Sequence, residues 1–381
     1  MSFEFQLTTR VVVGENTVER LGEMAQALGA SHVLLVTDPG LVAAGHVTRA
    51  ETSLKKANIA FTLFDAIEEN PTTRHVAHGT LFAREIGSID LIIGLGGGSA
   101  MDCAKGINFL LTNGGQMEDY WGTGKASKPM LPSIGVPTTA GTGSEAQSYA
   151  LISQEKTHIK MACGDKKALF KTVILDPTLL ASVPREVATA TGLDALSHAL
   201  ESYVSTAKTP FSQMLSREAW RLLSGAFATS LQNPADLRAQ TDMMLGAHYA
   251  GAAIENAMLG AAHACANPLT ARFGITHGLA VAVMLPAVMR FNLPEVGEAY
   301  QQLLDCTKPF EGAVRREDDA LAAQFTALRA LAGAPPSLER MGIPANVLSE
   351  LATDAAKQWT GRFNPRSLTE VDFLELYREA F

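Results

Sequence analysis

The sequence predicts an α/β N-terminal domain with a Rossmann-like parallel sheet, followed by an all-α C-terminal domain. Three observations favour this fold class. Short β-rich runs alternate with helical patterns in the first half of the chain, a glycine-rich turn follows one of these runs, and the second half has helical spacing throughout. We therefore expect one domain over residues 1–183 and a second, helical domain over residues 184–381.

The first half alternates strand and helix patterns, which predicts right-handed βαβ units and a mostly parallel sheet. The clearest strand candidates are residues 32–38, 60–67, 90–99 and 133–139, and the clearest helical candidates are residues 17–29 and 73–87. After residues 173–184 the pattern changes, and segments such as 241–259 are rich in Ala, Leu and Met at helical spacing. This change sets the expected domain boundary.

The amino-acid composition limits the kinds of molecule that this protein is expected to bind. The chain has 381 residues, of which 47% are hydrophobic, so it can bury the cores of two domains. Its net charge of −8 favours neither nucleic acid nor an anionic membrane. The N-terminus does not have the pattern of a signal peptide, and apolar stretches such as residues 279–289 are too short to span a bilayer. Four dispersed cysteines indicate free thiols, so we expect a cytoplasmic protein.

The glycine-rich turn "GLGGGSAMDCAKG", residues 94–106, follows a strand candidate and opens a helix. Glycines allow the backbone to approach a ligand closely, and a helix N-terminus offers unpaired N–H groups that suit a pyrophosphate. The turn departs from G-x-G-x-x-G because Ser99 occupies the last glycine position, and it is not in the first βα turn of the chain. The pattern therefore leaves two interpretations open, a phosphate site or simply a tight turn.

Two further turns follow strand candidates. Asp38 ends the early run "VLLVTD", where a carboxylate can bind an adenosine ribose and repel a 2′-phosphate. The alternative for Asp38 is turn initiation before Pro39 and Gly40. "PTTAGTGSE", residues 137–145, is rich in hydroxyl groups that can line a cofactor, or it is an ordinary polar loop.

Four residues of the second half form a candidate metal site. Asp194 and His198 are four apart in a helical pattern, so both side chains lie on one face. His263 and His277 would complete a set of one carboxylate and three imidazoles. Such a mixed N/O set suits Fe²⁺ or Zn²⁺ more than Mg²⁺ or Ca²⁺, and spacing does not choose between the two. Taken singly, each residue also has a purely structural explanation.

Taken together, the motifs resemble the iron-containing (group III) alcohol dehydrogenase family. The segments that carry this resemblance occur in the family's order and are spread over nearly the whole chain: "GLGGGSAMDCAKG", "GVPTTAGTGSE", "TGLDALSHALESY", "HACANPLTARFGITHG" and "FNPRSLTEVD". The resemblance implies an NAD-dependent oxidoreductase that interconverts a primary alcohol and its aldehyde by hydride transfer in an interdomain cleft. It also implies NAD(H) and Fe²⁺, with Zn²⁺ as the alternative ion.

The resemblance also assigns residues. It implies that the metal ligands are Asp194, His198, His263 and His277. The expected cofactor-binding positions are Asp38, Asn70, Gly97, Gly98, Ser99, Asp102, Thr138, Thr139, Thr142 and Lys160. Among these, Asp38 matches the position that favours NAD over NADP. We expect an apolar substrate pocket that includes Tyr149 and Ile254, with Phe273 as a third candidate.

His277 and Asn267 are the expected catalytic residues, and Asn267 departs from the family pattern. Many members carry a histidine four residues after the third metal ligand, where this chain has Asn267. On a helix this side chain would lie near His263, but an amide does not carry protons near neutral pH. We expect protons to leave through water and the cofactor ribose. The alternative is that Asn267 only ends a helix before Pro268.

The sequence leaves three alternative functions open. Reductases of acidic substrates, such as maleylacetate reductase and hydroxyacid–oxoacid transhydrogenase, would need clustered basic residues, whereas Arg272 and Arg362 stand alone in the sequence. A dehydroquinate-synthase-type lyase would carry a different metal set. A non-catalytic binding protein would not need the four ligands. The β-rich segment 3–14 and the family resemblance favour a homodimer or a higher homo-oligomer.

Overall fold

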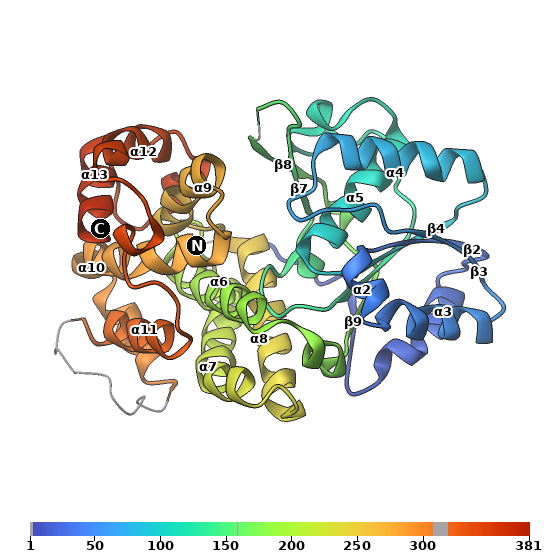
Figure 1. The fold of residues 1–381 in the computed structure, drawn as a ribbon, viewed down its shortest axis with the longest axis horizontal. Coiled ribbons are helices and arrows are strands. Elements are labelled where there is room, and N and C mark those ends of the chain that lie inside the picture. The colour runs from blue at the N-terminus through green and yellow to red at the C-terminus, as the bar shows by residue number, and fades with distance from the viewer. Residues whose placement is uncertain (1–2, 158, 308–318) are drawn as a thin grey trace. The chain divides into compact units, whose positions relative to one another are not determined.

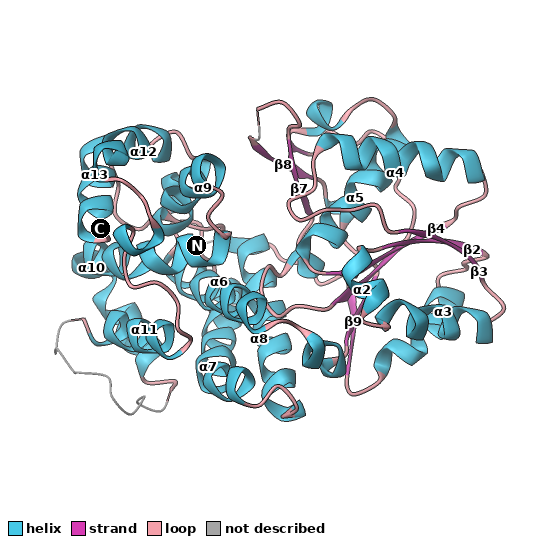
Figure 2. Cartoon of the chain, in the orientation of Figure 1, coloured by secondary structure: helices cyan, strands magenta, loops and turns pink. Residues whose placement is uncertain are grey.

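The computed structural model describes residues 3–157, 159–307 and 319–381. The chain forms two compact units. The first comprises Gln6–Val183, and the second comprises Pro184–Phe381 together with the start of the chain up to Phe5. Figure 2 shows the strands in the first unit, while the second unit is built from helices. The predicted fold class, a parallel α/β part followed by a helical part, is confirmed.

A six-stranded sheet forms the centre of the first unit, and all of its neighbouring strands are parallel. Its strand order is β1-β9-β6-β4-β2-β3. The strands are β1 (Arg10–Val13), β2 (His32–Val36), β3 (Ala60–Phe64), β4 (Leu91–Gly96), β6 (Ser133–Pro137) and β9 (Thr172–Leu175). The four predicted strand candidates correspond to β2, β3, β4 and β6.

Helices cover both faces of this sheet, as in a doubly wound fold (Figure 1). In β2, Leu34 and Val36 pack into one apolar core, whereas Val33 and Leu35 pack into the other, because successive side chains point to opposite faces. The first core includes residues of α4 (Thr73–Ile86) and α5 (Gly98–Asn113), and the second includes residues of α1 (Leu21–Ala27) and α3 (His46–Lys56).

The strand order contains a topological switch between β2 and β4. From β2 the chain passes outward to β3, and after β4 it passes in the other direction to β6. In parallel sheets the crevice at the carboxyl ends of two such strands is the usual place for a ligand. Asp38 follows β2 and Gly97 follows β4, so both flank this switch point.

Several strands were not predicted from the sequence. A second sheet has the order β5-β8-β7, with β5 (Gly122–Thr123), β7 (Tyr149–Ser153) and β8 (Lys160–Gly164). Strand β9 was also missed, because its four residues pass directly into a short helical turn. The N-terminal β-rich segment contributes β1, which pairs within its own chain with β9.

The second unit is a bundle of helices, and no strand occurs in the described part of it. Its α-helices are α6 (Arg185–Val204), α7 (Pro210–Gln232), α8 (Leu237–Ala257), α9 (Ala261–Phe273), α10 (His277–Leu304), α11 (Ala320–Leu331), α12 (Leu348–Ala355) and α13 (Glu370–Glu379).

Helix α10 is longer than the apolar stretch at residues 279–289 suggested. It has 28 residues and a non-helical residue, Val296, two positions after Pro294. By length and hydropathy alone this helix is able to cross a membrane, but 67% of its most apolar window is buried inside the protein. That burial is typical of the central helix of a folded bundle.

Candidate active site

Three helices of the second unit carry the predicted metal ligands. Asp194 and His198 lie one turn apart on α6, His263 lies in the first turn of α9, and His277 is the first residue of α10. Glycine explains how the start of α10 comes so close to α6. A Cβ atom on Gly278 would lie 2.0 Å from the carbonyl oxygen of Ala190 on α6, so only glycine fits there. This close approach places His277 beside Asp194.

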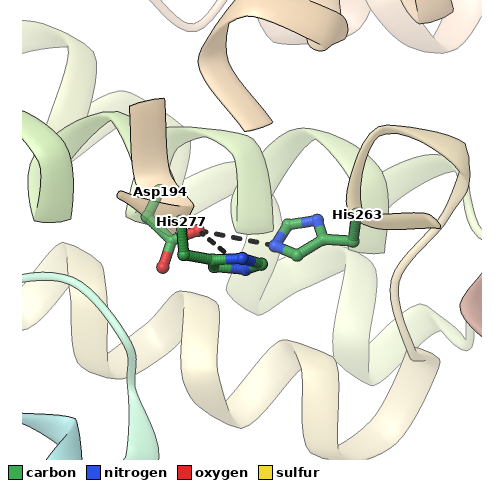
Figure 3. Close-up of side chains that lie close together, drawn as sticks. All are labelled: Asp194, His263 and His277. Atoms are coloured by element: carbon green, nitrogen blue, oxygen red, sulfur yellow. Dashed lines mark ion pairs between the residues drawn. The ribbon is translucent and has the colours of Figure 1, made fainter. Parts of the chain in front are cut away.

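The four side chains converge on one carboxylate oxygen. Asp194 Oδ1 lies 3.4 Å from His198 Nε2, 3.4 Å from His263 Nε2 and 4.0 Å from His277 Nε2. Figure 3 shows the side chains of Asp194, His263 and His277 directed toward one another. Each of these three residues offers a ligand atom within 4.8 Å of the other two, and His198 approaches the same oxygen from one turn further along α6.

This donor set fits a divalent metal ion. Asp194 Oδ1 and His263 Nε2 are buried, and neither forms a well-aligned hydrogen bond to any residue that the structure describes; their one contact is the ion pair that they form with each other at 3.4 Å. Buried polar atoms normally have a hydrogen-bond partner, so atoms without one point to a missing ligand. Four ligands placed tetrahedrally at about 2.1 Å from one ion would be roughly 3.4 Å apart, which agrees with the shorter separations.

The charges in the site also favour a cation. Burial would raise the pKa of Asp194, but the neighbouring imidazoles, His198 foremost, lower it well below the usual range. Burial would lower the pKa of His263, but the carboxylates of Glu201 and Asp194 raise it to about 9. The ring of His263 therefore experiences two nearby negative charges. A metal ion can supply the compensating positive charge that a proton otherwise supplies.

Glu201 was missed by the sequence analysis. It is buried on α6, and its Oε2 accepts a hydrogen bond from Nδ1 of His263 at 2.5 Å. A sequence signal does exist, since Asp194, His198 and Glu201 are spaced i, i+4 and i+7 and so form a polar stripe on one face of α6. The partner of Glu201 is 62 positions further along the chain, and no local pattern reveals it.

The glycine turn of the first unit has the predicted location. Gly97 is the N-cap of α5, which begins at Gly98 directly after β4. A Cβ atom on Gly98 would lie 2.7 Å from Thr142 Cγ2, and one on Gly97 would lie 3.6 Å from Thr139. The backbone N–H of Asn70 donates to Ser99 Oγ at 3.2 Å. The structure thus brings together residues from three of the predicted cofactor segments: Asn70, Gly97, Gly98, Ser99, Thr139 and Thr142.

Asp38 and Thr138 border the same turn. Asp38 is the N-cap of the short helix α2 (Pro39–Ala43), and its Oδ1 accepts a hydrogen bond from the N–H of Leu41. Its other oxygen lies 3.6 Å from the position of a Cβ atom on Gly96. Thr138 is buried, and its N–H donates to the carbonyl of Gly96. The alternative for Asp38 was turn initiation before Pro39 and Gly40; in the structure Asp38 instead caps a short helix that begins at Pro39, and it also lies beside the glycine turn.

Two predicted cofactor residues have different surroundings. Asp102 is buried in α5, accepts a hydrogen bond from Ser144 Oγ at 2.6 Å and lies 3.8 Å from Lys105 Nζ. Burial raises the pKa of Asp102, although Lys105 and the hydrogen bond from Ser144 oppose this effect. Asp102 thus anchors the loop that contains Thr142. Lys160 is exposed at the start of β8.

Asn267 does not end its helix, so that alternative was wrong. Helix α9 continues through Pro268 to Phe273. Asn267 Nδ2 donates to Gln358 Oε1 at 3.0 Å, and the side chain lies one turn after His263. The predicted pocket residues do not share one environment. Ile254 is buried near the end of α8, Phe273 is exposed at the end of α9, and Tyr149 belongs to the first unit.

Comparison with known proteins gives the same assignment over the whole chain. Residues 8–177 match the family described as iron-containing alcohol dehydrogenase, and residues 188–381 match the C-terminal part of the Fe-containing alcohol dehydrogenase family. Alcohol dehydrogenase 4 of Schizosaccharomyces pombe is 33% identical over 376 residues, which covers 99% of this chain and 88% of that protein. The 1,3-propanediol dehydrogenase of Citrobacter freundii is 33% identical over 384 residues, which covers 100% and 99%. The crystal structure of a 1,3-propanediol oxidoreductase has a TM-score of 0.94 at 32% identity and covers 100% of both chains.

Fold, site and comparisons define an oxidoreductase that interconverts alcohols and aldehydes. The chain belongs to the iron-containing alcohol dehydrogenase family. The relatives include alcohol dehydrogenases, 1,3-propanediol dehydrogenases and a lactaldehyde reductase. The rival functions, a reductase of acidic substrates or a lyase, are not favoured by these matches.

Proposed function

We propose that this protein is an NAD(H)-linked dehydrogenase of primary alcohols in which Asp194, His198, His263 and His277 hold one catalytic divalent ion. The ion is Fe²⁺, with Zn²⁺ as the alternative. The observation that carries the proposal is the pair of buried atoms, Asp194 Oδ1 and His263 Nε2, which have no hydrogen-bond partner among the described residues and face each other at 3.4 Å. Two relatives support NAD and the substrate class by name, an NAD-dependent methanol dehydrogenase and a 1,3-propanediol dehydrogenase.

A bound divalent ion would act as a Lewis acid, which lowers the pKa of a substrate hydroxyl and polarises a carbonyl. The residues of the chain keep this centre in place. Asp194 is buried, and its lowered pKa keeps its carboxylate ionised at every pH where the enzyme would work. The N–H at Nδ1 of His263 donates to Glu201, so Nε2 of the same ring is the nitrogen that can bind the ion once the ion has displaced its proton.

The first unit is proposed to bind NAD(H), which supplies or accepts the hydride. The N-terminus of α5 begins at Gly98 and offers its unpaired N–H groups to the pyrophosphate. Thr138, Thr139, Thr142 and Lys160 are the other proposed contacts, while Asp102 holds the loop around Ser144. Asp38 favours NAD because its carboxylate repels a 2′-phosphate group.

The surroundings of the two isolated arginines favour a neutral substrate. Arg272 forms ion pairs with Glu350 at 2.6 Å and with Asp354 at 2.5 Å. The guanidinium of Arg362 lies over the rings of Trp359 and Phe363. A carboxylate substrate would have to displace acidic partners from Arg272. We therefore propose a small or medium primary alcohol as the substrate, with Ile254 and Phe273 as candidate pocket residues of the second unit.

We also propose that the chain functions as a cytoplasmic homodimer. Apolar side chains are exposed along the start of the chain and on β1, and exposed apolar edges of this kind favour pairing with a second chain: Phe3, Phe5, Leu7, Val11 and Val13. Three of the four cysteines are buried free thiols, as expected in a reducing compartment.

The test combines metal content with turnover. The protein is purified without oxygen, stripped with a chelator, reloaded with Fe²⁺ or Zn²⁺, and assayed by NADH absorbance against a panel of primary alcohols and aldehydes. We expect activity to disappear on stripping and to return with one ion per chain. Bound metal without any net change in NADH would instead support a lyase or an untested acidic substrate. Absence of both metal and activity after reloading would contradict the proposed site.

A further inference from the structure

The carboxylate of Glu201 joins two features of the proposed metal site, the ring of His263 and the start of helix α9. Its Oε2 accepts a hydrogen bond from His263 Nδ1 at 2.5 Å, and its Oε1 accepts one from the backbone N–H of Ala262 at 2.7 Å. We propose that Glu201 is a positioning residue that fixes the tautomer and the orientation of His263, so that Nε2 is presented to the metal ion. The inference rests on the proposed function.

The geometry of the ring supports this role. An imidazole has two nitrogens, and a hydrogen bond from one of them decides which nitrogen keeps the lone pair. Here Nδ1 donates to Glu201, while Nε2 faces Asp194 Oδ1 at 3.4 Å. A carboxylate partner also makes the opposite nitrogen a stronger metal ligand than a neutral partner would.

The second oxygen of Glu201 fixes the backbone that carries this ring. Helix α9 starts after Gly260, which has no side chain to cap the helix. A Cβ atom on Gly260 would lie 3.0 Å from Glu201 Oε1, so the carboxylate lies where a capping side chain would otherwise be. Glu201 thereby satisfies one of the first N–H groups of α9 from a different helix. The carboxylate of Glu201 therefore holds both the ring of His263 and the start of helix α9.

Asn364 also supports the start of helix α9. None of its hydrogen bonds in the described part of the chain involves the ring of His263. Its Oδ1 accepts hydrogen bonds from the N–H of Ala261 at 3.4 Å and from Asn292 Nδ2 at 3.0 Å. Asn364 lies in the "FNPRSLTEVD" segment, so that late motif has a structural role beside the metal site. Asn364 therefore offers a matched comparison, because it supports α9 but does not orient His263.

Because Glu201 is buried, its carboxylate requires an explanation beyond helix capping. The side chain is only 3% exposed, and a buried carboxylate is costly to desolvate unless strong partners compensate. Capping a helix does not require a charge, since a serine or asparagine suffices. A negative charge next to His263 is explained by its effect on the metal ligand.

Replacing Glu201 by glutamine tests the proposal, because Glu201→Gln keeps the size of the side chain and removes its charge. Binding of Co²⁺ and Zn²⁺ to the stripped full-length protein is measured by competition with a chelator, and the visible spectrum of the Co²⁺ form is recorded. We expect the affinity of Glu201→Gln to fall by about 10- to 100-fold and the Co²⁺ spectrum to shift. We expect Asn364→Ala to stay within about threefold of wild type, since the ring keeps its partner.

A second measurement does not depend on the folding of Glu201→Gln. In the Zn²⁺ form of the wild-type protein, nitrogen NMR of labelled histidines reports which ring nitrogen is protonated, with His263 assigned by its absence in His263→Gln. We expect a protonated, slowly exchanging Nδ1 and a metal-bound Nε2. Wild-type affinity in Glu201→Gln, an equal loss in Asn364→Ala, or an unprotonated Nδ1 would each overturn the role of Glu201. Failure of the wild-type protein to bind any metal would instead overturn the proposed function.

Discussion

The carbonyl oxygen of Ala190 on α6 occupies the space that a side chain on Gly278 of α10 would need. A Cβ atom at position 278 would lie 2.0 Å from this oxygen and 3.2 Å from Asp194 Cβ. Gly278 directly follows His277, and Asp194 lies one turn after Ala190. The approach of these two helix backbones therefore sets the separation between two of the proposed metal ligands.

Gly278→Ala should consequently damage the metal site although it changes no ligand. A backbone oxygen cannot rotate away as a side chain can, so α10 must shift. We expect the free energy of unfolding to fall by about 1–3 kcal/mol and metal affinity to fall more than tenfold. Urea unfolding and chelator competition measure the two effects. Gly225→Ala is the control, because nothing lies within 4 Å of its added Cβ atom, and it should leave metal affinity unchanged. Wild-type affinity in Gly278→Ala would show that the ligand spacing does not depend on this contact.

Asp38→Asn should relax the preference for NAD over NADP. Asparagine is also a good N-cap, so the hydrogen bond to Leu41 and the start of α2 should be retained. Loss of the negative charge removes the repulsion of a 2′-phosphate. We expect the ratio of kcat/KM for NAD to that for NADP to fall by about tenfold or more, equivalent to roughly 1.4 kcal/mol. An unchanged ratio in a stable variant would mean that Asp38 only caps the helix.

Asn267→His should change the pH dependence of turnover. The new imidazole would lie one turn after His263 and titrate near neutral pH, where the amide of Asn267 does not. We expect kcat/KM to gain a titration step between about pH 6 and 8, measured with one alcohol over a full pH series. Asn267→Gln is the control, because it keeps an amide that can bond to Gln358. If Asn267→His and Asn267→Gln have the same pH profile, position 267 lies outside the proton path.

His46 gives a prediction about stability against pH. Burial lowers the pKa of His46 below 6.5, with Arg49 adding to the effect, and its Nε2 lies 2.6 Å from Ser182 Oγ. The unfolded chain therefore binds a proton at position 46 more readily than the folded protein does. The wild-type protein should lose stability relative to His46→Gln as pH falls through 6.5, whereas above that pH their difference should be constant. Urea unfolding of both stripped proteins at about pH 8 and about pH 5.5 tests this. A difference that stays constant, or moves the other way, would contradict the lowered pKa.

Much of the fold was predictable because it follows from local patterns. Buried parallel strands appear as continuous apolar runs, and this is how β2, β4 and β6 were predicted. Segment 3–14, which contains β1, was predicted as β-rich, but its pairing with β9 was not, because the partner residues are more than 160 positions away and periodicity does not contain such information. Strands β5, β7 and β8 were missed for a different reason. Strand β5 has only two residues, and β7 and β8 are only partly buried, so their sequences lack the continuous apolar runs of the central sheet.

Some residues of the candidate site could be predicted from the sequence, and others could not. Asp194 and His198 share a helix face, which the sequence shows directly, and motif resemblance added His263 and His277. Glu201 and Gly278 were not predicted, because their importance lies in contacts with His263 and Ala190 on other helices. The residues that position a metal ligand act through tertiary contacts, which the sequence does not reveal. The residue types and the spacing of the ligands themselves can be read from the sequence.

The proposed function depends on a single ion bound by three imidazoles and one carboxylate. X-ray absorption spectroscopy at the metal edge of the Fe²⁺-loaded protein tests it most directly. We expect N and O ligands at about 2.0–2.2 Å, with outer-sphere scattering from three imidazole rings that drops to two in His277→Ala. A shell of oxygen ligands without imidazole scattering, or a spectrum that His277→Ala leaves unchanged, would contradict it.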